Sequence, residues 1–297
     1  MPERPFARWR APSNLSEQER FAALLEHPRF EEAARALSRG MLALAAADKA
    51  LDGMVKDVGR YSATMMAIYL HATGGLTLPR LKALCAQSRL ISPGRARAIL
   101  LYLRFLKYVE PAGGGGRGGL YVPTAELQLA WQRIEQQTLE AVKIIEPDIA
   151  QVIPALDAPG AMLDFMRMQF AVASARRGPT DNALWRVFLN RHAGSQILHA
   201  LMQGGDEEDS YPPRGPMRYA LSRLARDLNV SRPHVARLLR AAEQEGLAVL
   251  EEGGVLRFTD EGRREATILL GLRLSSSLLA AMRFHDERQD MPLRRVG

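Results

Sequence analysis

The stretch from Ala220 to Thr259 constrains the fold of this chain more than any other part of the sequence. Apolar residues recur at helical spacing over residues 221–228 and again over residues 235–242, which predicts two short helices with one apolar face each. Between them, Ser231 has a side chain preferred at a helix N-cap, and Pro233 fits the first turn of the second helix. The segment is therefore predicted to fold as a helix, a tight turn and a second helix.

A β-hairpin is predicted to follow the second helix. Gly246 ends that helix, because glycine adopts the left-handed conformation of a helix C-cap without strain. Residues 247–250 and 255–258 have the character of strands, and Glu252-Gly253-Gly254 supplies the turn between them. The hairpin is then expected to lie behind the helix pair.

The side of the second helix that faces away from its apolar stripe is rich in arginine. A helix is about as wide as the DNA major groove, and the Arg guanidinium is shaped to grip a phosphate or the edge of guanine. For a lone basic helix, a charged face that is merely solvated is the alternative interpretation. The candidate DNA contacts of this segment are Arg223, Arg226, Ser231, Arg232, His234, Arg237, Arg240 and, on the hairpin, Arg257.

This order of elements resembles the winged-helix DNA-binding domains of bacterial transcription regulators, including the MarR-like group. The resemblance implies that residues 231–245 form a recognition helix whose outward arginines contact base edges or phosphates in the major groove. It also implies that Ser231 and the helix N-terminus hold a phosphate, and that Arg257 on the wing reaches the backbone or the minor groove. The resemblance rests on the pattern of elements and not on an invariant motif.

Residues 76–124 repeat the same order of elements. Aligning Ser92 with Ser231 brings the apolar positions of the two helices into register, and a long helical stretch follows each copy. A chance match between amphipathic helices is the alternative. The aligned pairs are Ala96 with Val235, Ile99 with Leu238, Leu100 with Leu239, and Leu103 with Ala242. We therefore expect two tandem winged-helix domains.

The two copies differ in their outward faces. Arg237 and Arg240 of the second copy correspond to Ala98 and Leu101 of the first. The outward surface of the first copy is expected to show Leu101, Tyr102 and Phe105. An apolar face of this kind is suited to being covered by another helix or subunit. The first domain is therefore expected to contribute phosphate contacts, packing or both. Its candidate DNA contacts are Lys82, Arg95, Arg97 and, in the glycine-rich loop, Arg117.

The predicted fold class is mainly α with small β-hairpin wings, as tandem winged-helix domains with flanking helices. The expected domains are an N-terminal arm with helices at 1–58, a first winged-helix domain with a trailing helix at 59–146, a helical linker at 147–182 and a second winged-helix domain with a C-terminal helix at 183–290. In the dimers that this chain resembles, terminal helices often form the subunit interface, so a homodimer through the N- or C-terminal helices is expected. The C-terminal helix is expected to bury Ile268, Leu269, Leu272, Leu278 and Leu279.

The charge balance favours a polyanionic partner. The formal net charge is +7 and the sequence pI is about 9.8. Among the charged residues, basic ones dominate at 80–107 and 218–240, whereas acidic ones dominate at 126–164. This pattern fits two nucleic-acid-facing modules with a different section between them. The start of the chain does not read as a secretion signal, and no run of 18 apolar residues predicts a membrane span. A cytoplasmic, nucleoid-associated protein is expected.

Enzyme chemistry has little support in the sequence. The formal GxGxxG within residues 113–119 precedes a strand instead of a helix, so it is interpreted as a wing tip that carries Arg117. Six histidines and the single Cys85 make no recognisable metal cluster, and His192 and His199 are interpreted as packing or surface residues. A methionine-rich helix at residues 161–175 favours core packing over a pocket for an apolar effector. No catalytic residue, cofactor or metal is expected.

The sequence is therefore interpreted as a double-stranded DNA-binding transcription regulator that recognises specific sites. A tandem winged-helix plasmid replication initiator and a winged-helix protein-interaction module are the alternatives. The operator, the sign of regulation, an effector and the oligomeric state stay open at this point.

Overall fold

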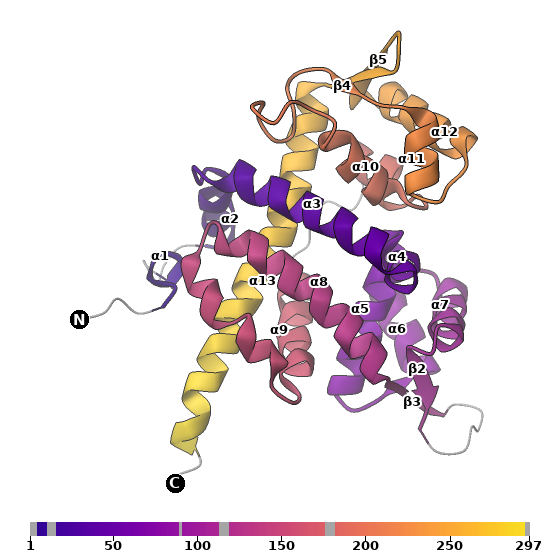
Figure 1. The fold of residues 1–297 in the computed structure, drawn as a ribbon. Helices are drawn as coiled ribbons and strands as arrows, with labels where there is room; N and C mark the ends of the chain where they lie inside the picture. The colour runs from indigo at the N-terminus through magenta and orange to yellow at the C-terminus, as the bar shows by residue number, and fades with distance from the viewer. Residues whose placement is uncertain (1–4, 11–15, 89–90, 113–118, 176–181, 295–297) are drawn as a thin grey trace.

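The computed structural model describes residues 5–10, 16–88, 91–112, 119–175 and 182–294. The chain is mainly helical with two small antiparallel sheets of three strands each, as the predicted fold class requires. In Figure 1 one sheet lies at the top of the molecule and the other at the lower right, with long helices between them.

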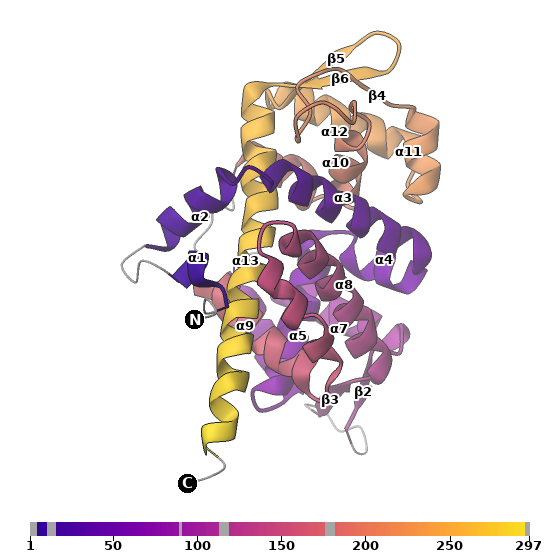
Figure 2. The same cartoon turned by 60° about the vertical axis from the view of Figure 1, so that its left-hand side comes forward.

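Long helices form the centre of the molecule. α3 (Phe30–Ala47) packs against α8 (Ala125–Lys143), and α13 (Asp260–Arg294) runs past both of them from the upper to the lower end in Figures 1 and 2. α9 (Ala161–Ala175) packs against α13 and α5 (Val58–Ala72). The methionines of α9, Met162, Met166 and Met168, are buried in this core. The N-terminal helices therefore share a core with later parts of the chain.

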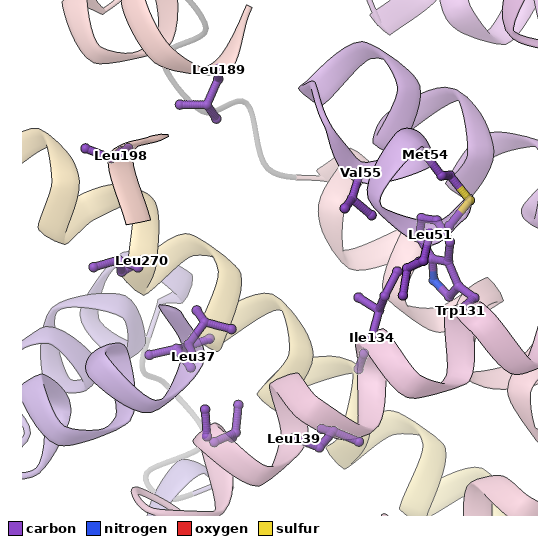
Figure 3. Close-up of a cluster of buried hydrophobic side chains, with 14 of the residues drawn as sticks. Leu37, Leu51, Met54, Val55, Trp131, Ile134, Leu139, Leu189, Leu198 and Leu270 are labelled. Atoms are coloured by element: carbon purple, nitrogen blue, oxygen red, sulfur yellow. The ribbon is translucent and has the colours of Figure 1, made fainter. Parts of the chain in front are cut away.

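Side chains from distant parts of the sequence meet in that core. Trp131 and Ile134 of α8 lie beside Leu51 and Met54 of α4 (Lys49–Val55) in Figure 3, and all of them are fully buried. At the other end of the helix layer, Phe6 just before α1 is buried and packs edge-on to the ring of His285 on α13. Other short helices of the chain are α1 (Ala7–Arg10), α2 (Glu17–Leu25), η1 (Pro147–Gln151), η2 (Pro154–Asp157) and η3 (Trp185–Leu189).

A buried ion pair lies within the apolar core. Arg273 on α13 donates to the Glu135 carboxylate on α8 at 2.9 Å, to the Thr138 hydroxyl at 2.9 Å and to the Tyr61 hydroxyl on α5. Gln169 on α9 donates to the other oxygen of Glu135 at 2.6 Å. Because Glu135 is fully buried, these donors replace the water that its charge would otherwise require. The network ties α5, α8, α9 and α13 together.

The first sheet belongs to residues 58–123. β3 (Leu120–Pro123) is the central strand and pairs antiparallel with both β1 (Leu76–Thr77) and β2 (Val109–Pro111). Two helices lie between β1 and β2 in the chain, namely α6 (Leu78–Ser88) and α7 (Pro93–Phe105).

The second sheet repeats this arrangement. β6 (Val255–Phe258) is central and pairs antiparallel with β4 (Met217–Arg218) and β5 (Ala248–Glu251). α10 (Gly194–Met202) precedes β4, as α5 precedes β1. The two helices between β4 and β5 are α11 (Leu221–Asp227) and α12 (Arg232–Gln244). Both groups thus have the same order of elements and the same strand order; strand β4 is an addition to the predicted hairpin.

The C-terminal helix α13 buries a different stripe from the one predicted. Ile268, Leu269 and Leu272 are only half-buried, whereas Leu270 and Leu274 are buried. Leu278 and Leu279 are buried as predicted. The register is set by contacts with α9, α8 and α2, which select residues at spacings of four along α13. This face of α13 is covered within the chain.

α13 is also long and apolar enough over Asp260–Gln289 to cross a membrane by length and composition. However, 67% of its most apolar window is buried inside the protein, which is the behaviour of a core helix. Among the described residues, no other helix passes this test.

Candidate nucleic-acid interface

The start of α12 is built as the sequence predicts. Ser231 is the N-cap with an extended backbone, φ −79° and ψ 147°, and its hydroxyl accepts from the backbone N–H of His234 at 3.3 Å. Pro233 lies in the first turn. The buried stripe packs on α11 and β5, so the opposite side of α12 faces solvent. This stripe consists of Val235, Leu238, Leu239 and Ala242.

Three arginines occupy the solvent side of α12. Arg232 and Arg237 are exposed, and neither has a hydrogen-bond or ion-pair partner among the described residues. Arg240 is exposed as well, and its Nε reaches only the carbonyl of Ala236 in its own helix, at 3.4 Å. No described carboxylate neutralises these guanidinium groups. The positive charge on this side of the helix is therefore available to an anionic partner.

The acidic residues at the end of α12 are engaged elsewhere. Glu243 accepts from the backbone N–H of Leu250 at 3.0 Å, which fastens the helix to β5. Glu245 lies 2.6 Å from Arg186 on η3. Both carboxylates therefore have partners away from the three arginines, and the outward side of the helix remains cationic.

The arginines of α11 share one carboxylate. Arg223 and Arg226 lie 3.4 Å and 3.3 Å from Asp227, and both guanidinium side chains are about three-quarters exposed, at 77% and 76%. Ion pairs this exposed contribute little to stability, because water competes for both charges. Arg257 on β6 has a similar contact with Glu251 across the hairpin, at 3.3 Å. These three side chains stay accessible to an external anion.

His234 is less free than predicted. Its Nε2 lies 2.7 Å from the carbonyl oxygen of His192, and the two imidazole rings meet edge-on with centroids 6.2 Å apart. Partial burial and the nearby charges of Lys56 and Arg60 lower the pKa of His192. The start of α12 is therefore held against the turn before α10, a contact that sequence spacing did not indicate.

Arg95 is part of the framework of the fold. Its guanidinium lies 2.6 Å from Asp57, whose other contacts include the N–H of Arg60 at 2.9 Å as the N-cap of α5. The prediction that Arg95 is a DNA contact overlooked this partner, although Asp57 stands in the sequence where an N-cap is expected. Arg97 is exposed and has no partner among the described residues.

Among the other candidates of the first copy, Lys82 on α6 is half-buried. Arg117 lies outside the described residues. Tyr102 does not face outward as predicted: the guanidinium of Arg60 stacks over its ring at 4.9 Å, and its hydroxyl lies against Gly53 of α4. The outward face of α7 is therefore narrower than the sequence suggests.

His199 has a hydrogen-bond partner within the fold. His199 lies 2.8 Å from the Ser38 hydroxyl through Nδ1, and burial lowers its pKa to about 4. Burial raises the pKa of the Cys85 thiol to about 11, so this thiol is not activated. Among the described residues, no group of three or more His, Cys, Asp or Glu residues is placed to hold a metal ion.

One cavity of about 360 Å³ lies at the lower part of α13, away from both sheets. It is lined by Gln151, Val152, Ala155, Phe284, His285, Arg288 and Gln289. Arg288 donates to the Ala155 carbonyl at 3.1 Å and lies over the face of the Phe284 ring, and both contacts hold its guanidinium at the wall of the cavity.

Comparison with protein-family models, with curated proteins and with solved structures gives no match to this chain. The arrangement of its own residues is therefore the basis for assigning a function.

Proposed function

We propose that this chain binds double-stranded DNA at specific sites and regulates transcription, with α12 as recognition helix and the β5–β6 hairpin as wing. The observation that carries the proposal is the set of exposed arginines on the outward side of α12, Arg232, Arg237 and Arg240. A helix that presents unneutralised guanidinium groups over its free side suits the width and the acceptor pattern of the major groove. The proposal includes no catalytic residue, cofactor or metal, and it assigns the protein to the nucleoid in the cytoplasm.

The position of each arginine suggests a role. Arg237 is central on the exposed side of α12, where a bidentate contact with guanine is most accessible. Arg232 in the first turn and Arg240 one turn further along are suited to flanking bases or phosphates. Arg223 and Arg226 on α11 can exchange their shared carboxylate for phosphates at little cost, because that ion pair is exposed.

The repeated order of elements supports tandem winged-helix domains. In each group a helix pair lies between the first and second strands, and the last strand is central in the sheet. In the first group the analogous helix α7 is capped by Ser92, whose hydroxyl accepts from the N–H of Arg95 at 3.3 Å. We assign Lys82 and Arg97 to phosphate contacts there and exclude Arg95 because of its pairing with Asp57.

Salt-dependent binding and site selection test the proposal. The full chain would be mixed with a random duplex library, bound DNA sequenced, and affinity for the enriched site measured by fluorescence anisotropy. If phosphates are contacted, affinity falls on the order of a thousandfold between roughly 50 and 200 mM salt. An enriched site with this salt dependence supports the proposal. Binding that is insensitive to salt, or a library that shows no enrichment, contradicts it.

A plasmid replication initiator is the second candidate. The same order of helices and strands occurs twice in this chain, and a tandem arrangement of winged-helix domains is what it would share with such proteins. The two candidates differ in what deletion of the gene does. Loss of a regulator shifts transcript levels of genes next to the bound sites. Loss of an initiator abolishes replication of the plasmid that carries those sites.

A further inference from the structure

The outward side of α7 is apolar where the outward side of α12 is cationic. Leu101 and Phe105 lie one helical turn apart on it and are 49% and 80% exposed as residues, and Ala98 precedes them by a further turn. Residues at these spacings form one stripe along a helix. In the alignment of the two copies, Ala98 and Leu101 stand where α12 has Arg237 and Arg240.

The stripe is not an extension of the core. The opposite side of α7 already supplies Ala96, Ile99, Leu100 and Leu103 to the interior. Phe105, which is four-fifths exposed, gains little from burial within its own chain. Adjacent exposed apolar side chains can mark a binding surface. Single exposed apolar residues occur elsewhere, such as Leu129 on α8, but α7 places two within one turn.

The rim of this stripe is positively charged. Arg97, Arg104 and Lys107 are exposed around it, and residues 80–107 contain no acidic residue. Arg104 also lies over the ring of Tyr121 at 5.8 Å, which holds its charge beside the helix. A second copy docked through the same face would bring these cations together, so self-association here is disfavoured. Anionic side chains are the complement that this rim selects.

DNA is a poor match for the centre of the stripe. Leu101 and Phe105 offer no hydrogen bond to a phosphate or a base edge, and burying them there would desolvate polar groups without pairing them. An amphipathic helix offers both features that are needed: apolar anchors at i, i+3 or i+4, and i+7, and acidic residues on either side.

We propose that the outward face of α7 docks an acidic amphipathic helix of a partner protein, with Leu101 and Phe105 as the apolar anchors. This inference goes beyond DNA binding, in which the base contacts are assigned to α12 and only phosphate contacts to Lys82 and Arg97, and it gives the first copy a protein partner as well. The chain then joins a DNA site to a recruited protein.

The test uses the full chain and a fluorescein-labelled synthetic peptide with leucines at i, i+3 and i+7 and glutamates elsewhere. Two control peptides carry lysines in place of the glutamates, or the same composition with the leucines dispersed around the helix. Saturable binding is expected for the acidic amphipathic peptide alone, and Phe105→Ala or Leu101→Ala should weaken it about tenfold. Leu129→Ala removes an equally exposed leucine on α8 and should leave peptide binding unchanged.

Absence of saturable binding of the acidic peptide, or equal binding by Phe105→Ala, Leu101→Ala and unaltered protein, overturns the proposal. The affinity of Phe105→Ala for the enriched DNA site separates this inference from the proposed function, and it should stay within about twofold of the unaltered protein. A tenfold loss would assign the α7 face to DNA instead. Peptide binding by a chain that fails to bind DNA would retain the docking surface and refute the proposed function.

Discussion

The Arg95 guanidinium lies 2.6 Å from the Asp57 carboxylate, and the carboxylate is buried while the guanidinium is 42% exposed. Asp57 caps α5 and Arg95 belongs to the first turn of α7, so this pair joins the starts of two helices. Burial of the carboxylate makes the pair more important to the fold than an exposed pair would be.

We therefore expect replacement of Arg95 to affect stability more than DNA binding. Arg95→Ala should lower the free energy of unfolding by about 1 kcal/mol, since Asp57 keeps Arg60 and its capping bond but loses its closest cation. Arg97→Ala removes an exposed arginine two residues away and should leave stability unchanged. Urea unfolding measures the free energy of unfolding of both variants, and Arg97→Ala should be the more stable of the two. Tenfold weaker DNA binding by a folded Arg95→Ala would restore it as a DNA contact.

Arg237→Ala should weaken binding to the preferred DNA site by roughly 1–3 kcal/mol and relax specificity at one base pair. The reason is the loss of a bidentate donor that has no intramolecular role to compensate. Arg283→Ala removes the same charge from an exposed position on α13, away from α12, and is the matched control. Fluorescence anisotropy on the enriched site measures both variants. Equal affinities of the two variants would refute the assignment of Arg237.

Glu135→Ala should destabilise the protein by about 3–5 kcal/mol, because it leaves the Arg273 guanidinium without its carboxylate inside the core. Glu140→Ala on the same helix removes an exposed carboxylate whose partner is Lys143, and it should change stability by less than about 0.5 kcal/mol. Denaturant unfolding of the two variants provides the comparison. Replacing Glu135 and Arg273 together by leucine should recover part of the loss, and a further loss in that double variant would count against the ion pair as the cause.

His199 should make stability depend on pH. Its pKa is about 4 in the folded protein against an ordinary value of 6.5, so the unfolded chain binds the proton first. The stabilisation is complete above the unfolded value and is lost as the pH falls toward 4. Between about pH 8 and pH 5, this residue should cost the protein about 2 kcal/mol of unfolding free energy. His199→Gln does not titrate, so its stability should fall less over the same range; an identical fall would exclude His199 as the source.

Replacement by alanine should change stability in opposite directions at Gly262 and Gly94. A Cβ at Gly262 would lie 2.0 Å from the carbonyl oxygen of Leu247, so Gly262→Ala must push the start of α13 away from the second sheet. A loss of more than about 2 kcal/mol is expected from such overpacking. No heavy atom lies within 4 Å of a Cβ at Gly94 in α7, and Gly94→Ala should stabilise by about 0.5–1 kcal/mol. Thermal unfolding shows whether the two melting temperatures move in opposite directions.

Local sequence patterns were sufficient to predict many of the helices and their ends. The cap at Ser231, the stripe from Val235 to Ala242 and the end of α12 at Gly246 lie where predicted, because propensity, capping and amphipathic spacing act within a few residues. The same reasoning found α7 and its buried positions. It misplaced the buried stripe of α13, because a helix that is apolar on several sides takes its register from its neighbours.

Local sequence patterns were enough to predict the two groups of helices and strands and the positions of the arginines along α11 and α12. They could not predict which of the candidate side chains are free, because that depends on contacts from other parts of the chain. Arg237 has no described partner, whereas Arg95 is bound by Asp57 and His234 by the carbonyl of His192. The physical reason is that helical spacing fixes the direction of a side chain from its own helix, but a neutralising partner comes from a segment far away in the chain, and packing alone brings it within reach.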